Sequence, residues 1–457
     1  MMQHNMRTFY TLILTQTFSL IGSRISGLAI AIWVFGETGN ATPLALVSFF
    51  GALPMVLASS ISGVLADRWD RRYVMVIADA GQALGTFLLL LSVASGDFQL
   101  WHLYVVTLIQ SVFGVFQGPA FQASVTMLVP DNQRDRANAI QQMTSPAAGV
   151  IAPVIAAGVY GLVGLNGAIL ADLLTFVAAA AVVLLVHIPR PAQTAEGLAA
   201  KGSVWKEMWS GLGYLRKRRS LLFLVLYICI VNFLIAGVMT LTTPYVLART
   251  GNSEALLGLF LGLSNMGMLV GGIIMGVWGG TRPRIHTVMG GILIISLMLM
   301  LVGTAQSVVW LGITITLLLL PIAPINAAVM SIMQTKVAPD LQGRVFAALG
   351  QISILLLPLS YLLIGPLTDV VFEPAVGLAG WERVAPLVGN TPGAGMGLLM
   401  LIAGAGITVI SLVVYSLPAV RQMEANLPDY VPVATEEFAA EAVLEIAAAP
   451  QPDLPLA

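Results

Sequence analysis

The chain has 457 residues, of which 58% are hydrophobic and only 9% are charged. Soluble domains carry about 25% charged residues, so this composition excludes an ordinary water-soluble protein. The net charge of −1 gives no reason to expect a nucleic acid or another polyanion as a partner. The single cysteine, Cys229, excludes an intramolecular disulfide and suits a small buried apolar side chain.

Twelve apolar stretches are long enough to cross a membrane. A helix needs about 20 residues to span the hydrocarbon, and an open sheet would leave backbone groups unpaired in lipid. We therefore expect an all-α integral membrane protein with twelve transmembrane helices, the first of them retained rather than cleaved as a signal peptide. The predicted spans are 8–35, 42–66, 73–95, 101–128, 138–160, 166–188, 221–247, 255–279, 285–304, 308–335, 345–370 and 395–417.

Lysine and arginine residues gather on one side of these spans. If the N-terminus is cytoplasmic, 18 of the 21 basic residues lie in inner segments, and the outer loops hold only Arg249 and Arg383. This asymmetry follows the positive-inside rule. We therefore expect both termini in the cytoplasm and the protein in the plasma (inner) membrane.

Three ionisable side chains lie within the spans, where each costs about 2.5–3.5 kcal/mol at a helix centre. At a rise of about 1.5 Å per residue, Arg24 lies past the midplane of the first span, and Asp79 and Asp172 lie nearer opposite surfaces. One or both acids are candidates for proton coupling; alternatively, each is a structural tie. The tie is favoured for Asp79, which is close enough to pair with arginines of the inner loop. Arg24 is expected to line the cavity, as a countercharge or a substrate contact.

A short charged segment, residues 63–72, separates the second and third spans. It reads Gly-Val-Leu-Ala-Asp-Arg-Trp-Asp-Arg-Arg. Charges this dense cannot lie in hydrocarbon, so the segment marks a membrane boundary. It resembles the loop between helices 2 and 3 of the major facilitator superfamily of transporters, with the pattern G-x-x-x-D-R/K-x-G-R/K-R/K. The matching residues are Gly63, Asp67, Arg68, Arg71 and Arg72, whereas Asp70 replaces the second glycine.

The resemblance implies a conformational latch. In the superfamily this acid, here Asp67, lies against the N-terminus of helix 11, where the helix dipole favours a carboxylate by about 0.3–1 kcal/mol. Arg72 and Arg136 would complete a charge network that holds the inner gate shut in the outward-open state. The alternative is an ordinary positive-inside loop, which explains the arginines but not Gly63 and Asp67.

Side-chain amides in the spans are further cavity candidates, because an unpaired amide facing lipid is expensive. The sequence does not decide which of them face a cavity. The candidates are Gln110, Gln117, Gln122, Asn232, Asn265 and Asn326.

The fifth span carries small residues and a proline that permit close packing and bend the helix: Gly149, Pro153 and Gly158. This pattern resembles part of the Gly-Pro signature that accompanies export by antiport in the superfamily. It is incomplete, since Ala152 and Ala157 stand where glycines are expected.

The spans divide into two halves with similar sequence patterns. We expect an N-terminal six-helix bundle (1–188), a cytoplasmic linker (189–220), a C-terminal six-helix bundle (221–417) and an acidic, disordered cytoplasmic tail (418–457).

The linker reads as a solvated connection, or as an amphipathic helix over Trp205–Tyr214 on the inner leaflet. Prolines recur 205 residues apart, Pro119 with Pro324 and Pro153 with Pro358. Two pseudo-symmetric bundles place a substrate site between them near mid-bilayer.

No catalytic constellation, metal site or Walker-type phosphate loop is found, so we expect neither an enzyme nor a cofactor, and a proton gradient as the energy source. The stretch Leu108–Pro191 resembles the drug:proton antiporter branch that holds macrolide-efflux proteins and the enterobactin exporter. This resemblance implies a monomeric secondary exporter of a small amphipathic molecule (a drug, macrolide or siderophore-like product) that exchanges it for protons across the bilayer by alternating access. The alternative functions are those of an importer or lysophospholipid flippase of the same fold, or of a non-transporting membrane receptor.

Overall fold

The computed structural model describes residues 6–130, 133–186 and 212–427, and over these residues it contains helices and no strand. The first half of the chain forms α1 (Met6–Thr38), α2 (Thr42–Arg68), α3 (Arg71–Ala94), α4 (Leu100–Leu128) and α5 (Arg134–Leu185). The second half forms α8 (Arg219–Thr240), α9 (Thr242–Arg249), α10 (Glu254–Trp278), α11 (Ile285–Gly303), α12 (Val308–Leu318), α13 (Ile322–Lys336), α14 (Pro339–Ile354), α15 (Leu357–Pro366), the π-helix η2 (Leu367–Phe372), the 3-10 turn η3 (Trp381–Arg383), α16 (Ala385–Val388), α17 (Ala394–Ser416), α18 (Pro418–Arg421) and α19 (Met423–Asn426).

Ten helices in the described part of the chain are long and apolar enough to cross a membrane. One of them, Arg136–Leu185, covers two predicted spans, since α5 continues through a break at Gly164, where φ is +67°. The apolar part of α2, Thr42–Ala58, is shorter. The all-helical membrane fold is confirmed, whereas the number of twelve spans stays a prediction.

Large apolar side chains cover the outside of the bundle. Leu162, Leu185 and Val277 are each at least 85% exposed, and many other leucine, isoleucine and valine side chains are more than one-third exposed. So much apolar surface is unfavourable in water, whereas hydrocarbon accommodates it. The chain is therefore a multi-pass membrane protein.

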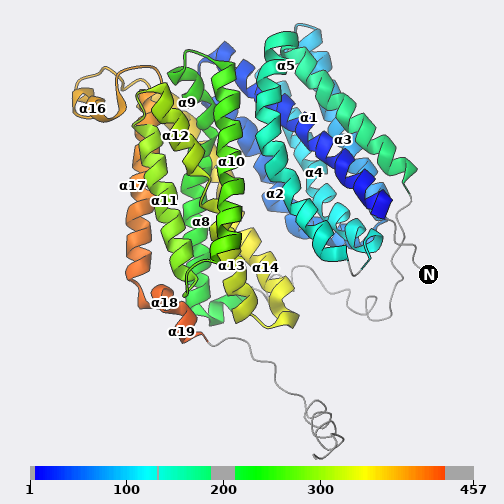
Figure 1. Cartoon of the computed structure of the whole chain (residues 1–457). Coiled ribbons are helices and arrows are strands. Elements are labelled where there is room, and N and C mark those ends of the chain that lie inside the picture. The colour runs from blue at the N-terminus through cyan, green and yellow to red at the C-terminus, as the bar shows by residue number, and fades with distance from the viewer. Residues whose placement is uncertain (1–5, 131–132, 187–211, 428–457) are drawn as a thin grey trace, which may run out of the picture.

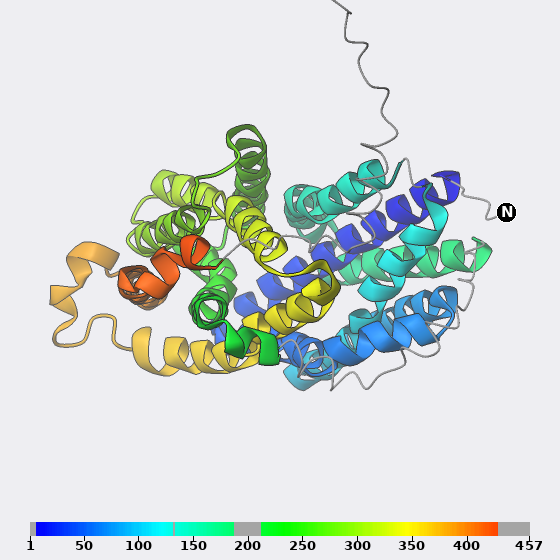
Figure 2. The ribbon, with the colours of Figure 1, turned by 90° about the horizontal axis from the view of Figure 1, so that it is seen from below.

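The helices form two groups that lie side by side (Figure 1). In the first half α1 packs against α5, and α4 against both α2 and α3; in the second, α11 packs against α17 and α8 against α14 and α15. The groups meet where α10 contacts α5 and where α15 contacts α2. Seen along the bundle in Figure 2, each half is a separate cluster, and α1 and α2 reach towards the second half.

Small residues allow the two halves to approach closely. A Cβ added at Gly258 of α10 would lie 2.6 Å from the carbonyl oxygen of Pro153, and one at Gly365 of α15 would lie 2.6 Å from the Cα of Thr42. Both distances are too short for any side chain, so glycine is required at both contacts. The close contacts fix how the halves meet.

The start of the predicted tail is folded rather than disordered. The buried Lys336 ammonium donates to the carbonyl oxygens of Glu424, at 2.7 Å, and Leu427. The Glu424 carboxylate accepts from the backbone N–H of Ile285 at the start of α11, at 2.7 Å. A buried ammonium needs acceptors, and these carbonyls provide them. The disorder expected from residue 418 onwards is therefore wrong for residues 418–427, and residues 428–457 lie outside the described part.

The end of the predicted linker also packs on the second half. Residues 212–217 are helical, and the Tyr214 hydroxyl donates to the Lys336 carbonyl oxygen at 3.3 Å. Most of the possible amphipathic helix at Trp205–Tyr214, together with residues 189–204, lies outside the described residues.

Candidate functional site

Asp79 is completely buried in the first half and is held by side-chain amides. One carboxylate oxygen accepts from Gln117 Nε2 at 2.6 Å and the other from Gln16 Nε2 at 3.2 Å. Gln117 also donates to Gln16 Oε1 at 2.8 Å and accepts from Gln82 Nε2 at 2.9 Å. The result is a closed ring of hydrogen bonds that joins α1, α3 and α4 around one acid.

Asp172 of α5 is 3% exposed and is held by hydroxyl groups. Its two oxygens accept from Ser23 Oγ at 2.9 Å and from Thr86 Oγ1 at 3.1 Å. Gln110 Nε2 in turn donates to the Thr86 hydroxyl at 2.8 Å. This second centre joins α1, α3, α4 and α5.

The partners of the two acids differ from those expected for a structural tie to arginine. Two of the inner-loop arginines bind backbone carbonyls of α4 and α5 instead: Arg71 donates to Ala123 at 3.0 Å, and Arg72 donates to Val183 at 3.2 Å and to Leu184. The Arg72 contacts join α3 to the end of α5. The prediction that Asp79 pairs with these arginines is therefore wrong, because the arginines are occupied and the acid is bound by Gln16 and Gln117.

The rest of the predicted latch is placed only in part. Gly63, Asp67 and Arg68 lie in the last turns of α2, but their side chains lie outside the described residues. Arg136 is exposed near the start of α5. The latch role of these residues stays a prediction.

Arg24 lies where α1, α5 and α10 meet, between the two halves. Its guanidinium donates to Ser145 Oγ at 2.8 Å. The Arg24 Nη1 and the Asn265 Oδ1 both lie over Gly149, where an added Cβ would be 2.6 Å from the arginine nitrogen and would overlap the amide oxygen. In the described part of the chain, Arg24 has no carboxylate partner among its hydrogen bonds. Because Gly149 has no side chain, the Arg24 guanidinium can occupy the space above it.

The other residues of the predicted helix bend have different surroundings. The Pro153 carbonyl faces Gly258 of the second half, whereas a Cβ added at Gly158 would meet nothing within 4 Å. The first is a contact between the halves; the second has no close neighbour.

Two pockets of the first half are each lined in part by glutamine side chains. One, of about 450 Å³, includes Gln16, Gln117 and Gln141, and the other, of about 530 Å³, includes Gln110. Gln82 lies in both. Both volumes are in the usual range for small-molecule sites, about 300–1,000 Å³.

The remaining predicted amides divide between cavity and surface. Asn232 and Asn326 line a pocket of about 350 Å³ in the second half. Asn265 donates to the Leu261 carbonyl at 2.9 Å and lies beside Arg24. Gln122 is exposed and lines none of the pockets described here. Sequence reasoning missed Gln16, Gln82, Thr86 and Ser145, although their polarity within apolar spans was a signal.

A carboxylate in η2 joins the two halves and was also missed. The oxygens of Asp369 accept from the backbone N–H groups of Ala41, at 2.9 Å, and Thr42, at 2.7 Å. These N–H groups begin α2, where the helix dipole favours a negative charge. We call this contact the Asp369 clamp; it holds the halves together beside the contact of α15 with α2.

Comparisons with known proteins agree with this arrangement. Residues 12–359 match the family model described as Major Facilitator Superfamily. The chain is 28% identical over 385 residues to Macrolide efflux protein A of Streptococcus pyogenes, which covers 82% of this chain and 91% of that protein. It is 27% identical over 333 residues to Macrolide efflux protein A of Enterococcus faecalis, covering 70% and 99%.

Solved structures share the fold. A bacterial homolog to the human lysosomal transporter Spinster, in an inward-facing and unoccupied conformation, superposes with a TM-score of 0.73 at 16% identity and covers 95% of this chain and 100% of that one. The nucleoside transporter NupG gives a TM-score of 0.64 at 11% identity, covering 90% and 98%.

A Gly149→Ala substitution is expected to destabilise the protein by about 1–3 kcal/mol, the usual cost of overpacking, because the new methyl group displaces Arg24 and Asn265. Gly158→Ala is the matched control in the same helix and should change stability by less than about 1 kcal/mol. Thermal unfolding of the purified protein, followed by tryptophan fluorescence, measures both. Equal shifts in the two variants would contradict the packing described for Arg24.

Asp369→Leu is expected to open the end of the molecule at which α2 begins. Losing about 2 kcal/mol of charge-assisted hydrogen bonding shifts a two-state equilibrium about 30-fold. Distances between spin labels at the exposed positions Glu37 and Glu382, on a Cys229→Ser background, report the opening. Asp369→Asn keeps one acceptor oxygen and should give an intermediate result, whereas Asp97→Leu, at an exposed loop position, should change nothing. An unchanged distance distribution in Asp369→Leu would show that the clamp does not hold the halves together.

Proposed function

Because this chain belongs to the major facilitator superfamily, we propose that it is an efflux transporter for a small amphipathic molecule of the macrolide type. The observation that carries this proposal is the 28% identity to Macrolide efflux protein A over 91% of that protein. The glutamine-rich pockets of the first half and the apolar pocket of the second suit a molecule with both polar and apolar parts.

The contacts between the halves support transport by alternating access. The Asp369 clamp and Gly365 join the halves where α2 begins, and Figure 1 shows α1 running away from the second half towards its N-terminal end. With both termini in the cytoplasm of a plasma-membrane protein, as the basic residues predict, the clamped end faces outward. The conformation would then be open towards the cytoplasm, where an exporter takes up its substrate.

We assign proton coupling to Asp172, because its neighbours tolerate either charge state. The Ser23 hydroxyl lies 3.1 Å from the Ser19 carbonyl oxygen as well as 2.9 Å from the acid. The Thr86 hydroxyl lies 3.2 Å from the Gln82 carbonyl oxygen. When the acid takes up a proton, both hydroxyls can turn to these carbonyls, so no buried donor loses its partner. Ser23 also lines a first-half pocket, which gives protons a short route.

Asp79 is less suited to the same role. Its donors are amide groups, and Gln16 Nε2 has no second acceptor among the described residues. Protonation of Asp79 would turn one of its two accepting oxygens into a hydroxyl that faces an amide N–H. An amide nitrogen, unlike a serine or threonine hydroxyl, cannot turn to accept that hydrogen, so one of the two hydrogen bonds would weaken. Asp79 therefore serves as a structural centre of the first half. Protons that move down their gradient through Asp172 would supply the energy for export by a monomer, with no cofactor and no enzymatic step.

Expression of the protein in a macrolide-sensitive bacterium tests the direction of transport. We expect a severalfold higher inhibitory concentration of erythromycin and a lower accumulation of radiolabelled erythromycin that returns to the control level when a protonophore is added. Higher accumulation than in the empty host would indicate import and contradict the proposal.

Asp172→Asn is expected to abolish proton movement coupled to erythromycin in inverted membrane vesicles, followed with a pH-sensitive dye, because the amide cannot exchange a proton. Binding of erythromycin should persist. Asp79→Asn should retain coupled proton movement, although its stability decreases. Wild-type proton movement in Asp172→Asn would exclude this residue as the coupling site.

A further inference from the structure

We propose that the second half by itself forms a binding pocket for the uncharged, apolar part of the transported molecule, with the Ser353 hydroxyl as its hydrogen-bonding contact. The inference rests on the proposed function only in that the bound molecule is one that the transporter moves. Beyond that function, it names the pocket that binds the apolar part of the molecule and the kind of hydrogen bond made there.

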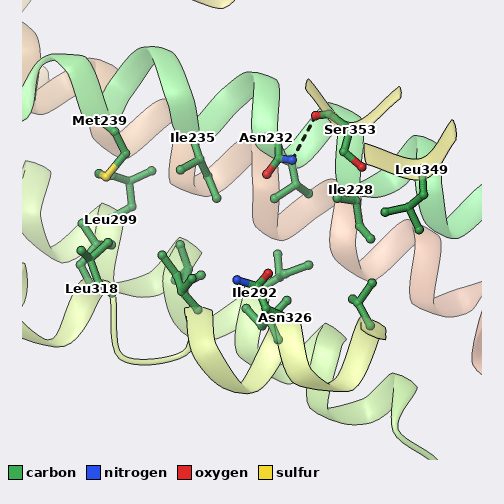
Figure 3. Close-up of a pocket in the computed structure, with 16 residues that line it drawn as sticks. Ile228, Asn232, Ile235, Met239, Ile292, Leu299, Leu318, Asn326, Leu349 and Ser353 are labelled. Carbon is green, nitrogen blue, oxygen red and sulfur yellow. Dashed lines mark hydrogen bonds between the residues drawn. The ribbon is translucent and has the colours of Figure 1, made fainter. Parts of the chain in front are cut away.

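The pocket is enclosed by helices of the second half alone. It has a volume of about 350 Å³, and its walls come from α8, α11, α12, α13 and α14, with Leu319 directly after α12. Figure 3 shows aliphatic side chains on opposite walls, among them Ile235, Ile292 and Leu318, with the Met239 thioether at one end. Methionine adapts its shape to different apolar ligands.

The polarity of the lining selects uncharged ligands. Of the sixteen residues that line the pocket, only Asn232, Asn326 and Ser353 are polar, and none is ionisable. A charged group placed there would lose its hydration without gaining a counter-ion. A neutral ligand loses much less, so the pocket favours it.

Ser353 supplies an unused hydrogen-bonding group. The residue is 8% exposed, and its Oγ has no hydrogen-bond partner among the described residues. Its backbone carbonyl is already occupied, since Asn232 Nδ2 donates to it at 3.1 Å, the contact drawn in Figure 3. Buried hydroxyl groups are nearly always paired. An acceptor on a bound ligand, such as a ketone or ester oxygen, would complete the pairing.

The wall position of Ser353 is fixed by the fold. α14 ends at Ile354, one residue further on, and α15 begins at Leu357. The Asn232 amide ties α8 to the last turn of α14 at this break. The hydroxyl is therefore held at a defined point of the pocket wall rather than on a mobile loop.

The first half offers the complementary chemistry. Its pocket of about 450 Å³ is lined by Gln16, Gln82, Gln117 and Gln141 together with hydroxyl side chains. The polar lining of the first-half pocket and the aliphatic lining of the second-half pocket thus offer complementary chemistry to an amphipathic molecule.

The test uses the purified full-length protein and tritiated progesterone, an uncharged, rigid apolar probe with two ketone acceptors. A scintillation-proximity assay with excess unlabelled probe measures saturable binding. We expect saturable binding to the wild type, weakened about three- to tenfold in Ser353→Ala by loss of one hydrogen bond. Ile295→Trp fills the pocket and should abolish binding, whereas Ile294→Trp, next to it but 48% exposed, should bind as the wild type does.

The outcomes separate this inference from the proposed export. Absence of saturable progesterone binding, or equal binding in wild type, Ser353→Ala and Ile295→Trp, would overturn the pocket assignment whatever the erythromycin measurements give. Should Ile295→Trp fail to fold, Ser353→Ala, which removes only one oxygen, decides alone. Displacement of progesterone by the apolar cation tetraphenylphosphonium would contradict the preference for uncharged ligands. If progesterone binds as expected but the protein confers no erythromycin resistance, the pocket assignment stands and the proposed export function is overturned.

Discussion

A carboxylate inside a membrane protein must be paired by groups that the protein itself supplies, and the first half is organised by this constraint. Asp79 and Asp172 are buried and are held by amides and hydroxyls from neighbouring helices rather than by arginines. Neutral donors form hydrogen bonds to the carboxylate oxygens without a counter-ion that would hold the acid in its charged form. The two centres tie α1 and α3 to α4 and α5, so the packing of the half depends on them.

The two halves share an architecture but differ in chemistry. The first half buries its acids among glutamine, serine and threonine side chains, whereas the pocket of the second half is almost entirely aliphatic. The contacts between the halves include close approaches at glycines, the charge-assisted Asp369 clamp, and a hydrogen bond from Gln351 Nε2 of α14 to the Val56 carbonyl oxygen of α2. Few strong contacts across an interface are compatible with two alternative arrangements, which is what an exporter that opens to each side in turn requires.

In the proposed mechanism, the two buried acids have different roles. The Ser23 and Thr86 hydroxyls that bind Asp172 each have a second acceptor one turn earlier in their own helix, so the proposed change of charge at this site costs its surroundings little. The amide donors of the Asp79 ring cannot turn in this way, so the proposed role of that acid is to stabilise the fold. Both residues look alike in the sequence, as single acids within apolar spans, and only their donors distinguish them.

The sequence by itself determined the membrane class, the placing of most helices, and Arg24, Asp79 and Asp172 as unusual positions, because the cost of a charge in hydrocarbon depends on composition along the chain. Which partner each group takes was decided by the tertiary structure. Asp369 meets α2 across 328 and 327 residues of sequence, and the free hydroxyl of Ser353 lies in a pocket built by distant helices. Hydrogen bonds act over about 3 Å in space, so a pairing between residues this far apart leaves no mark in the local sequence.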